Sequence, residues 1–173
     1  GQIELDRLVV PLKNRDGEIA AWCLAIPFLR PGDVPKVTTD GDSYLEGIAL
    51  LYRQALELAL NRRQPGQAII ALGHCHMSGG QTSEDSERRI VIGGVEALPV
   101  DMFDPVIAYA ALGHLHRPQT VGGQPRVRYC GSPLPMSFAE IHYPHQVVRI
   151  DLDGGSVREI ASLPIPRPVE LLR

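Results

Sequence analysis

The sequence contains few cysteines, few aromatic residues and no long hydrophobic run. Its 173 residues include three cysteines, Cys23, Cys75 and Cys130, and an odd number cannot form a complete disulfide framework. All three lie within apolar stretches, which predicts reduced, buried thiols in a cytoplasmic protein. No apolar stretch reaches the roughly 18 residues that a membrane-spanning helix needs. We therefore expect a soluble protein that folds without covalent cross-links, because 44% of its residues are hydrophobic and can form a core.

An excess of positive charge is lacking as well. The 17 Lys and Arg residues are outnumbered by 20 Asp and Glu residues, which gives a net charge of -3. Bulk charge therefore does not predict a nucleic-acid-binding protein, and any contact with phosphate would have to be local. The sequence has no P-loop and no G-x-G-x-x-G motif. Ser78 and Ser132 lie outside any G-x-S-x-G elbow and are not expected to be nucleophiles.

One segment, residues 43–62, has the pattern of an amphipathic helix. Ser43 and Glu46 fit a capping box, in which each side chain would accept a hydrogen bond from a free amide of the first turn. Apolar residues follow at helical spacing, namely Leu45, Ile48, Ala49, Tyr52, Ala55, Leu56 and Ala59. Pro65 and Gly66 end the pattern.

Most other segments have the residue types of β-strands. They span residues 8–12, 19–29, 67–75, 89–98, 107–114, 126–132, 145–152 and 157–165. The turn sequence NRDG at 14–17 predicts a hairpin of the first two. The segments 67–75 and 107–114 are continuously apolar, as expected of strands covered on both faces. The sequence thus predicts an α/β (α+β) fold that is rich in strands and has one long helix.

Histidine is concentrated in the second half of the chain, at positions 74, 76, 114, 116, 142 and 145. Four of these residues form two Gly-His-x-His units, each directly after a predicted buried strand. Residues i and i+2 of an extended chain point to the same side, so each unit can present two imidazoles together. We therefore predict a metal site formed by these histidines. Cys75 should point away from them and be a buried thiol.

Four stretches of the chain resemble one known family. ALGHLHRPQ (111–119), VRYCGSPLPMSFAE (127–140), IPFLRPGD (26–33) and IGGVEALPVDMF (92–103) are similar to SbcD-type nuclease subunits, which are calcineurin-like metallophosphoesterases. The resemblance implies part of a two-sheet β-sandwich flanked by helices. For the full-length protein it implies DNA phosphodiester hydrolysis in repair, two Mn²⁺ (or Mg²⁺) ions, an SbcC-like ATPase partner and a homodimer.

The resemblance also implies roles for individual histidines. His74 and His114 would bind one ion and His116 the other, whereas His76 is a less favoured ligand. The family's Asp-x-His and Gly-Asn-His-Asp motifs are absent from this sequence, and with them the histidine that assists the reaction. We therefore expect residues 1–165 to be the C-terminal portion of the nuclease domain, and residues 166–173 to begin a linker toward a DNA-capping domain.

By this interpretation the 173 residues contain no catalytic residue and are inactive alone. Three histidines without carboxylates should bind metal weakly and prefer zinc or nickel to manganese, since imidazole is a borderline-soft ligand. Half of a sandwich should also expose an apolar face.

Two other functions stay open at the level of sequence. The chain could belong to another small metallophosphoesterase, acting on nucleotides or phosphoproteins, although GSPLPMSFAE argues against this. It could also be a non-catalytic histidine-rich structural or interaction domain. The residues that bind substrate are unknown.

Overall fold

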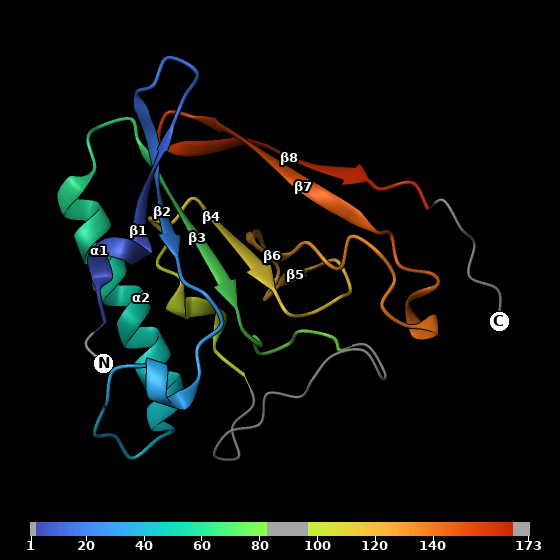
Figure 1. Ribbon diagram of the computed structural model, residues 1–173, viewed down its shortest axis with the longest axis horizontal. Helices are drawn as coiled ribbons and strands as arrows, with labels where there is room; N and C mark the ends of the chain where they lie inside the picture. The colour runs from blue at the N-terminus through green and yellow to red at the C-terminus, as the bar shows by residue number, and fades with distance from the viewer. Residues whose placement is uncertain (1–2, 83–96, 168–173) are drawn as a thin grey trace.

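The computed structural model describes residues 3–82 and 97–167 (Figure 1). Their strands form a six-stranded sheet of order β1-β2-β3-β4-β6-β5 and a separate two-stranded sheet, β7-β8. The strands are β1 (Val9–Lys13), β2 (Ile19–Ala25), β3 (Ala68–His74), β4 (Tyr109–Gly113), β5 (Gln119–Val121), β6 (Gln124–Tyr129), β7 (Gln146–Asp153) and β8 (Ser156–Pro164). The helices are α1 (Leu5–Leu8) and α2 (Ser43–Arg62), with short 3-10 helices η1 (Pro31–Asp33), η2 (Val100–Met102) and η3 (Phe138–Glu140). The mixed α/β fold class predicted from the sequence is confirmed.

Helix α2 has the limits predicted for it, but not the predicted cap. Asp42, not Ser43, precedes the helix, and its carboxylate accepts hydrogen bonds from the amides of Tyr44 and Leu45. The predicted capping box of Ser43 and Glu46 is therefore wrong. Asp and Ser are about equally good caps, so the sequence alone could not choose between these neighbours. The apolar face of α2 includes Ala55 and other buried side chains, and it packs against the sheet.

The middle of the large sheet is parallel. Strand β2 pairs with β3, β3 with β4, and β4 with β6, all in parallel, while β1 and β5 pair antiparallel at the two edges. The predicted hairpin of β1 and β2 is confirmed, and the Asn14 side chain stabilises its turn by accepting from the amides of Asp16 and Glu18. Because β3 and β4 run the same way, their carboxyl ends meet at one edge of the sheet (Figure 1).

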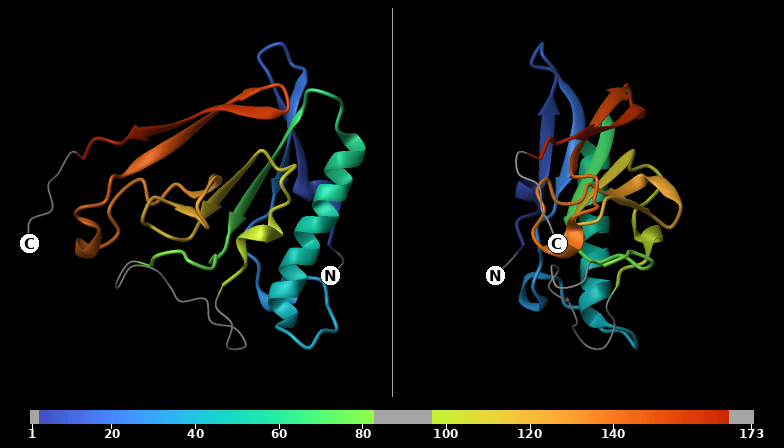
Figure 2. Two further views of the ribbon diagram at one scale, coloured as in Figure 1. Left: turned by 180° about the vertical axis from the view of Figure 1, so that it is seen from behind. Right: turned by 90° about the vertical axis from the view of Figure 1, so that its right-hand side faces the viewer.

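The β7-β8 hairpin covers part of the face opposite the main core. Val127 and Tyr129 are fully buried in the core, so Arg128 between them points to the other face, where its guanidinium donates to the Ser162 hydroxyl. The hairpin runs as a long arm away from the start of β3 (Figure 2). Leu72 of β3 stays 40% exposed. The prediction that this strand is covered on both faces is therefore wrong for its carboxyl end, because a two-stranded arm cannot cover the full sheet.

One predicted strand lies mostly outside the described residues, and two short elements of the fold were not predicted. The predicted strand 89–98 lies almost entirely outside the described residues. The short elements α1 and β5 were not predicted, because four and three residues carry too little periodicity. Within the described part of the chain, no helix is both long and apolar enough to cross a membrane.

Candidate functional site

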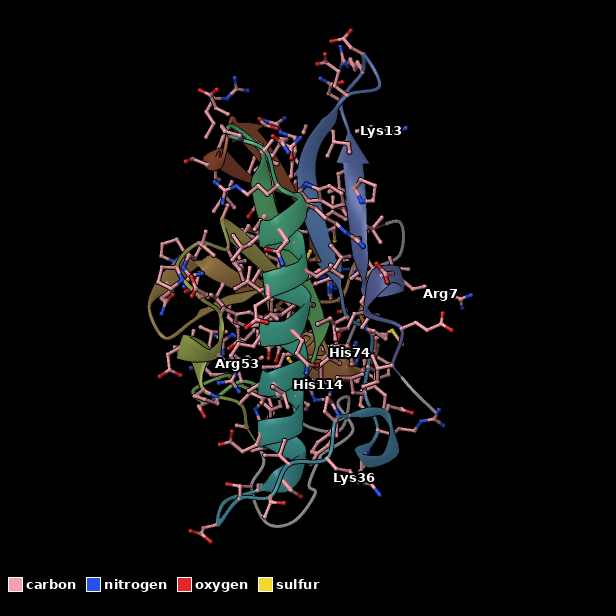
Figure 3. All side chains as sticks on the ribbon, turned by 90° about the vertical axis from the view of Figure 1, so that its left-hand side faces the viewer. Arg7, Lys13, Lys36, Arg53, His74 and His114 are labelled. Carbon is pink, nitrogen blue, oxygen red and sulfur yellow. The ribbon has the colours of Figure 1, made fainter. Side chains whose placement is uncertain are left out.

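The two Gly-His-x-His units lie side by side at the carboxyl ends of β3 and β4. His74, the last residue of β3, is the register partner of Gly113, the last residue of β4. The ring centres of His74 and His114 are 5.4 Å apart, and those of His76 and His114 are 6.1 Å apart. Figure 3 shows His74 and His114 next to each other at this edge. Three imidazoles, two from one unit and one from the other, therefore lie close together.

Both glycines of these units lie in close contacts that a larger residue would crowd. A Cβ on Gly113 would lie 3.1 Å from Nδ1 of His74, so the backbone of β4 forms one wall for this ring. A Cβ on Gly73 would clash with the hydroxyl oxygen of Tyr52. His114 has a φ of 107°, the only positive value at a non-glycine position among the described residues. The chain thus leaves the strand conformation at His114, in a backbone geometry that is strained for an L-residue and often found at functional sites.

Two buried tyrosines hold the end of β3 in place. The Tyr129 hydroxyl donates to the carbonyl of Cys75 at 2.6 Å and accepts from the amide of Met77 at 3.0 Å. The Tyr52 hydroxyl of α2 donates to the carbonyl of Leu72 at 2.8 Å. Burial raises the pKa of both tyrosines, so each hydroxyl keeps its proton for these bonds. The backbone that presents His74 and His76 is therefore fixed from two neighbouring elements.

His116 contacts a buried carboxylate. Its Nδ1 lies 2.7 Å from Oε1 of Glu140, and the Glu140 side chain is completely inaccessible to solvent. The other carboxylate oxygen accepts from the Ser132 hydroxyl at 3.1 Å and from the Met136 amide at 2.9 Å. The segment from Ser132 to Glu140 is thus folded around the Glu140 carboxylate that faces His116.

Burial favours the neutral forms of the His74 imidazole and the Cys75 thiol. The outer side of His74 is open to solvent, but partial burial of its ring lowers its pKa below the usual range, and the nearby His116 lowers it further. A neutral imidazole has a free lone pair for a metal ion. Burial raises the pKa of the Cys75 thiol to about 12. Cys75 is therefore a buried thiol, as predicted, and not a thiolate ligand.

The spacing of His74 and His114 fits two ligands of one ion. A metal–nitrogen bond of about 2.1 Å puts each ring centre about 3 Å from the ion, and two such rings about 5 Å apart. The observed 5.4 Å is close to this. Among the described residues, however, no three His, Cys, Asp or Glu side chains are arranged to hold a metal ion by themselves. The histidines therefore fit part of a metal site, which needs further ligands.

The remaining histidines have different surroundings. His142 is exposed in the segment before β7. His145 is buried, and its Nδ1 donates to the carbonyl of Ser132 at 3.0 Å. Its Nε2 is one of two buried side-chain atoms in the described residues that lack a hydrogen-bond partner. Neither histidine was predicted as a ligand.

Sequence reasoning missed Glu140 and Tyr129. Glu140 is the only charged residue between Tyr129 and Ile141, and an isolated acidic residue in such a stretch was the available signal. No local pattern in the sequence indicated the role of Tyr129, because its partners Cys75 and Met77 lie more than 50 positions away.

The fold and the site define a mixed α/β protein with paired imidazoles at adjacent strand ends. No family model matches the chain. It is 44% identical to the SbcD subunit of the SbcCD nuclease of Rhodobacter capsulatus over all of this chain and 43% of that protein. It is 37% identical to the SbcD subunit of Escherichia coli K12, over 94% of this chain and 42% of that protein. It is 36% identical to the SbcD subunit of Bacillus subtilis, over 79% of this chain and 35% of that protein. The resemblance to SbcD-type nuclease subunits is thereby confirmed along the whole chain, which spans less than half the length of these relatives.

Proposed function

We propose that this chain forms part of the nuclease domain of an SbcD-like protein and supplies histidine ligands for two divalent ions, Mn²⁺ or Mg²⁺. The observation that carries the proposal is the position of the two Gly-His-x-His units. They lie at adjacent strand ends in a chain that is 44% identical, over its full length, to a nuclease subunit. When bound, the ions would supply Lewis-acid stabilisation of the charge that develops at a DNA phosphate.

Each histidine has a specific role in this proposal. His74 and His114 hold one ion, supported by the 5.4 Å between their ring centres. His116 holds the other ion and is oriented by its contact with Glu140 at 2.7 Å. His76 is near His114, at 6.1 Å, and is not a ligand. The carboxylate and asparagine ligands come from residues outside this chain, so the 173 residues are inactive alone.

The wider function follows from the same family relationship. The full-length protein hydrolyses DNA phosphodiesters in repair as a homodimer, together with an SbcC-like ATPase, in the cytoplasm. Residues 1–165 are the C-terminal portion of the metallophosphoesterase domain, and 166–173 begin the linker to a DNA-capping domain.

The test is manganese-dependent degradation of DNA by the full-length protein. We expect His114→Ala and His116→Ala each to reduce the rate by about 100-fold or more, because losing a ligand costs more than the 10- to 100-fold typical of a residue that supports one. His142→Ala is the matched control, since His142 is exposed and distant in sequence from both units. Full activity in both ligand variants would contradict the proposal. Hydrolysis of nucleotides but not of DNA by the wild-type protein would favour the other metallophosphoesterase function.

A further inference from the structure

Glu140 is the only completely buried carboxylate among the described residues. Burying a carboxylate is costly unless hydrogen bonds compensate for the lost water. Glu140 ends the short helix η3, far from the metal-binding strand ends in sequence but in contact with His116. Such a costly arrangement needs a reason beyond closing a surface loop.

The two oxygens of Glu140 have different partners. Oε2 accepts from two groups of its own segment, the Ser132 hydroxyl and the Met136 amide. Oε1 faces Nδ1 of His116 at 2.7 Å, the short distance of a charge-assisted hydrogen bond. The segment also bonds to the main chain of His116, because the His116 carbonyl accepts a hydrogen bond from the Ser132 amide at 3.0 Å. His116 is thus held at both its side chain and its main chain.

This contact determines which ring nitrogen carries the proton. An ionised carboxylate oxygen that faces Nδ1 can only accept, so Nδ1 must donate, and in the neutral ring Nε2 is then the nitrogen with the lone pair. A negative carboxylate on Nδ1 also makes Nε2 a stronger ligand. We propose that Glu140 is a positioning residue, which fixes the Nδ1-protonated tautomer of His116 and directs its Nε2 to a divalent metal ion. This inference rests on the proposed function of His116 as a ligand.

Glu140→Gln separates this role from a purely structural one. The glutamine oxygen can replace Oε2 and accept from Ser132 and Met136, so the segment keeps its local bonds. The amide group then faces Nδ1 of His116 as a donor, which forces the proton onto Nε2 and removes its lone pair. A structural role would leave the tautomer and metal affinity unchanged, whereas the positioning role predicts that both change.

The experiment uses the full-length protein with ¹⁵N-labelled histidine and Mn²⁺ as the probe. In the metal-free wild type we expect the His116 signals of an Nδ1-protonated ring; in Glu140→Gln we expect protonation at Nε2 and Mn²⁺ affinity reduced about 10- to 100-fold. Ser137→Ala is the control, because it removes the side-chain cap of η3 but none of the groups that bond to the Glu140 carboxylate from Ser132, Met136 and His116. We expect it to keep wild-type affinity.

Two results would overturn the inference. One is an Nε2-protonated His116 in the wild type, which needs no variant and so does not depend on whether Glu140→Gln folds. The other is equal Mn²⁺ affinity in wild type and Glu140→Gln. His116→Ala separates a failure of the proposed function from a failure of the role of Glu140. Unchanged Mn²⁺ affinity in His116→Ala contradicts the proposed function. Weakened Mn²⁺ binding in His116→Ala, with unchanged binding in Glu140→Gln, contradicts only the role of Glu140.

Discussion

His74 and His76 are two positions apart in sequence but differ in how they are held. His74 is the last residue of β3, lies against the backbone of Gly113 and has its ring centre 5.4 Å from that of His114. His76 follows the strand, and its ring centre is farther from His114, at 6.1 Å. The first arrangement is the better one for sharing an ion.

We therefore expect His74→Ala to reduce manganese-dependent DNA hydrolysis by the full-length protein by about 100-fold, and His76→Ala by less than about 10-fold. The measurement is the initial rate at saturating Mn²⁺. A similar loss in both variants would mean that His76 is also a ligand.

Cys75 lies between these histidines, and its thiol responds to pH in a predictable way. Burial raises its pKa from 9.0 to about 12, so the folded protein keeps this proton where the unfolded chain loses it. The contribution of this pKa shift to the free energy of unfolding is fully present below pH 9, and it is lost as the pH rises from 9 toward 12.

At pH 8 we expect iodoacetamide to leave Cys75 unmodified in the native protein and to modify it quickly in urea, because the thiolate is the reactive form. Mass spectrometry of the digested protein measures this. Equal modification rates in both conditions would contradict the assignment of Cys75 as a buried thiol.

At the scale of elements, the site depends on β6 as much as on the strands that carry the histidines. Tyr129 of β6 bonds to both Cys75 and Met77, although β4 lies between β3 and β6 in the sheet. The segment after β3 is thereby attached to a third strand.

Tyr129→Phe should reduce stability by about 1–3 kcal/mol, because it leaves a buried carbonyl and a buried amide without partners. In the full-length protein we also expect faster hydrogen exchange of the Met77 amide. Tyr109→Phe is the control, a buried tyrosine of β4 with no bond to this segment among the described residues. Equal effects of the two changes would show that the Tyr129 hydroxyl has no special role.

At the scale of the whole molecule, the chain has the size of a domain but only some of the ligands of the proposed metal site. Leu72 and Phe28, which lie near the histidines, are 40% and 47% exposed, so the open face of the sheet is apolar beside the site.

We expect the isolated 173 residues to show no manganese-dependent DNA hydrolysis. They should bind Zn²⁺ or Ni²⁺ more tightly than Mn²⁺, as imidazole donors without carboxylates do. Isothermal titration with each metal and a nuclease assay on the same preparation measure both. DNA hydrolysis by this chain, abolished by a chelator, would contradict the proposal that other residues complete the site.

The sequence by itself determined the long helix, most of the strands and the main histidine pair. The helical spacing of α2 and the apolar runs of β3 and β4 are local patterns, and local patterns determine secondary structure when they are long. Two Gly-His-x-His units after two such strands led us to predict a histidine metal site, and the parallel pairing of β3 and β4 places both units at one edge of the sheet.

Only the tertiary structure decided how the histidines are held. Glu140 meets His116 across 24 positions, and Tyr129 meets Met77 across 52, so no periodicity in the sequence connects them. The exposure of Leu72 could not be predicted from the sequence for the same reason, because it depends on how far the β7-β8 arm extends over the sheet. Burial and hydrogen bonding between distant segments are properties of the folded chain, because they exist only once those segments meet.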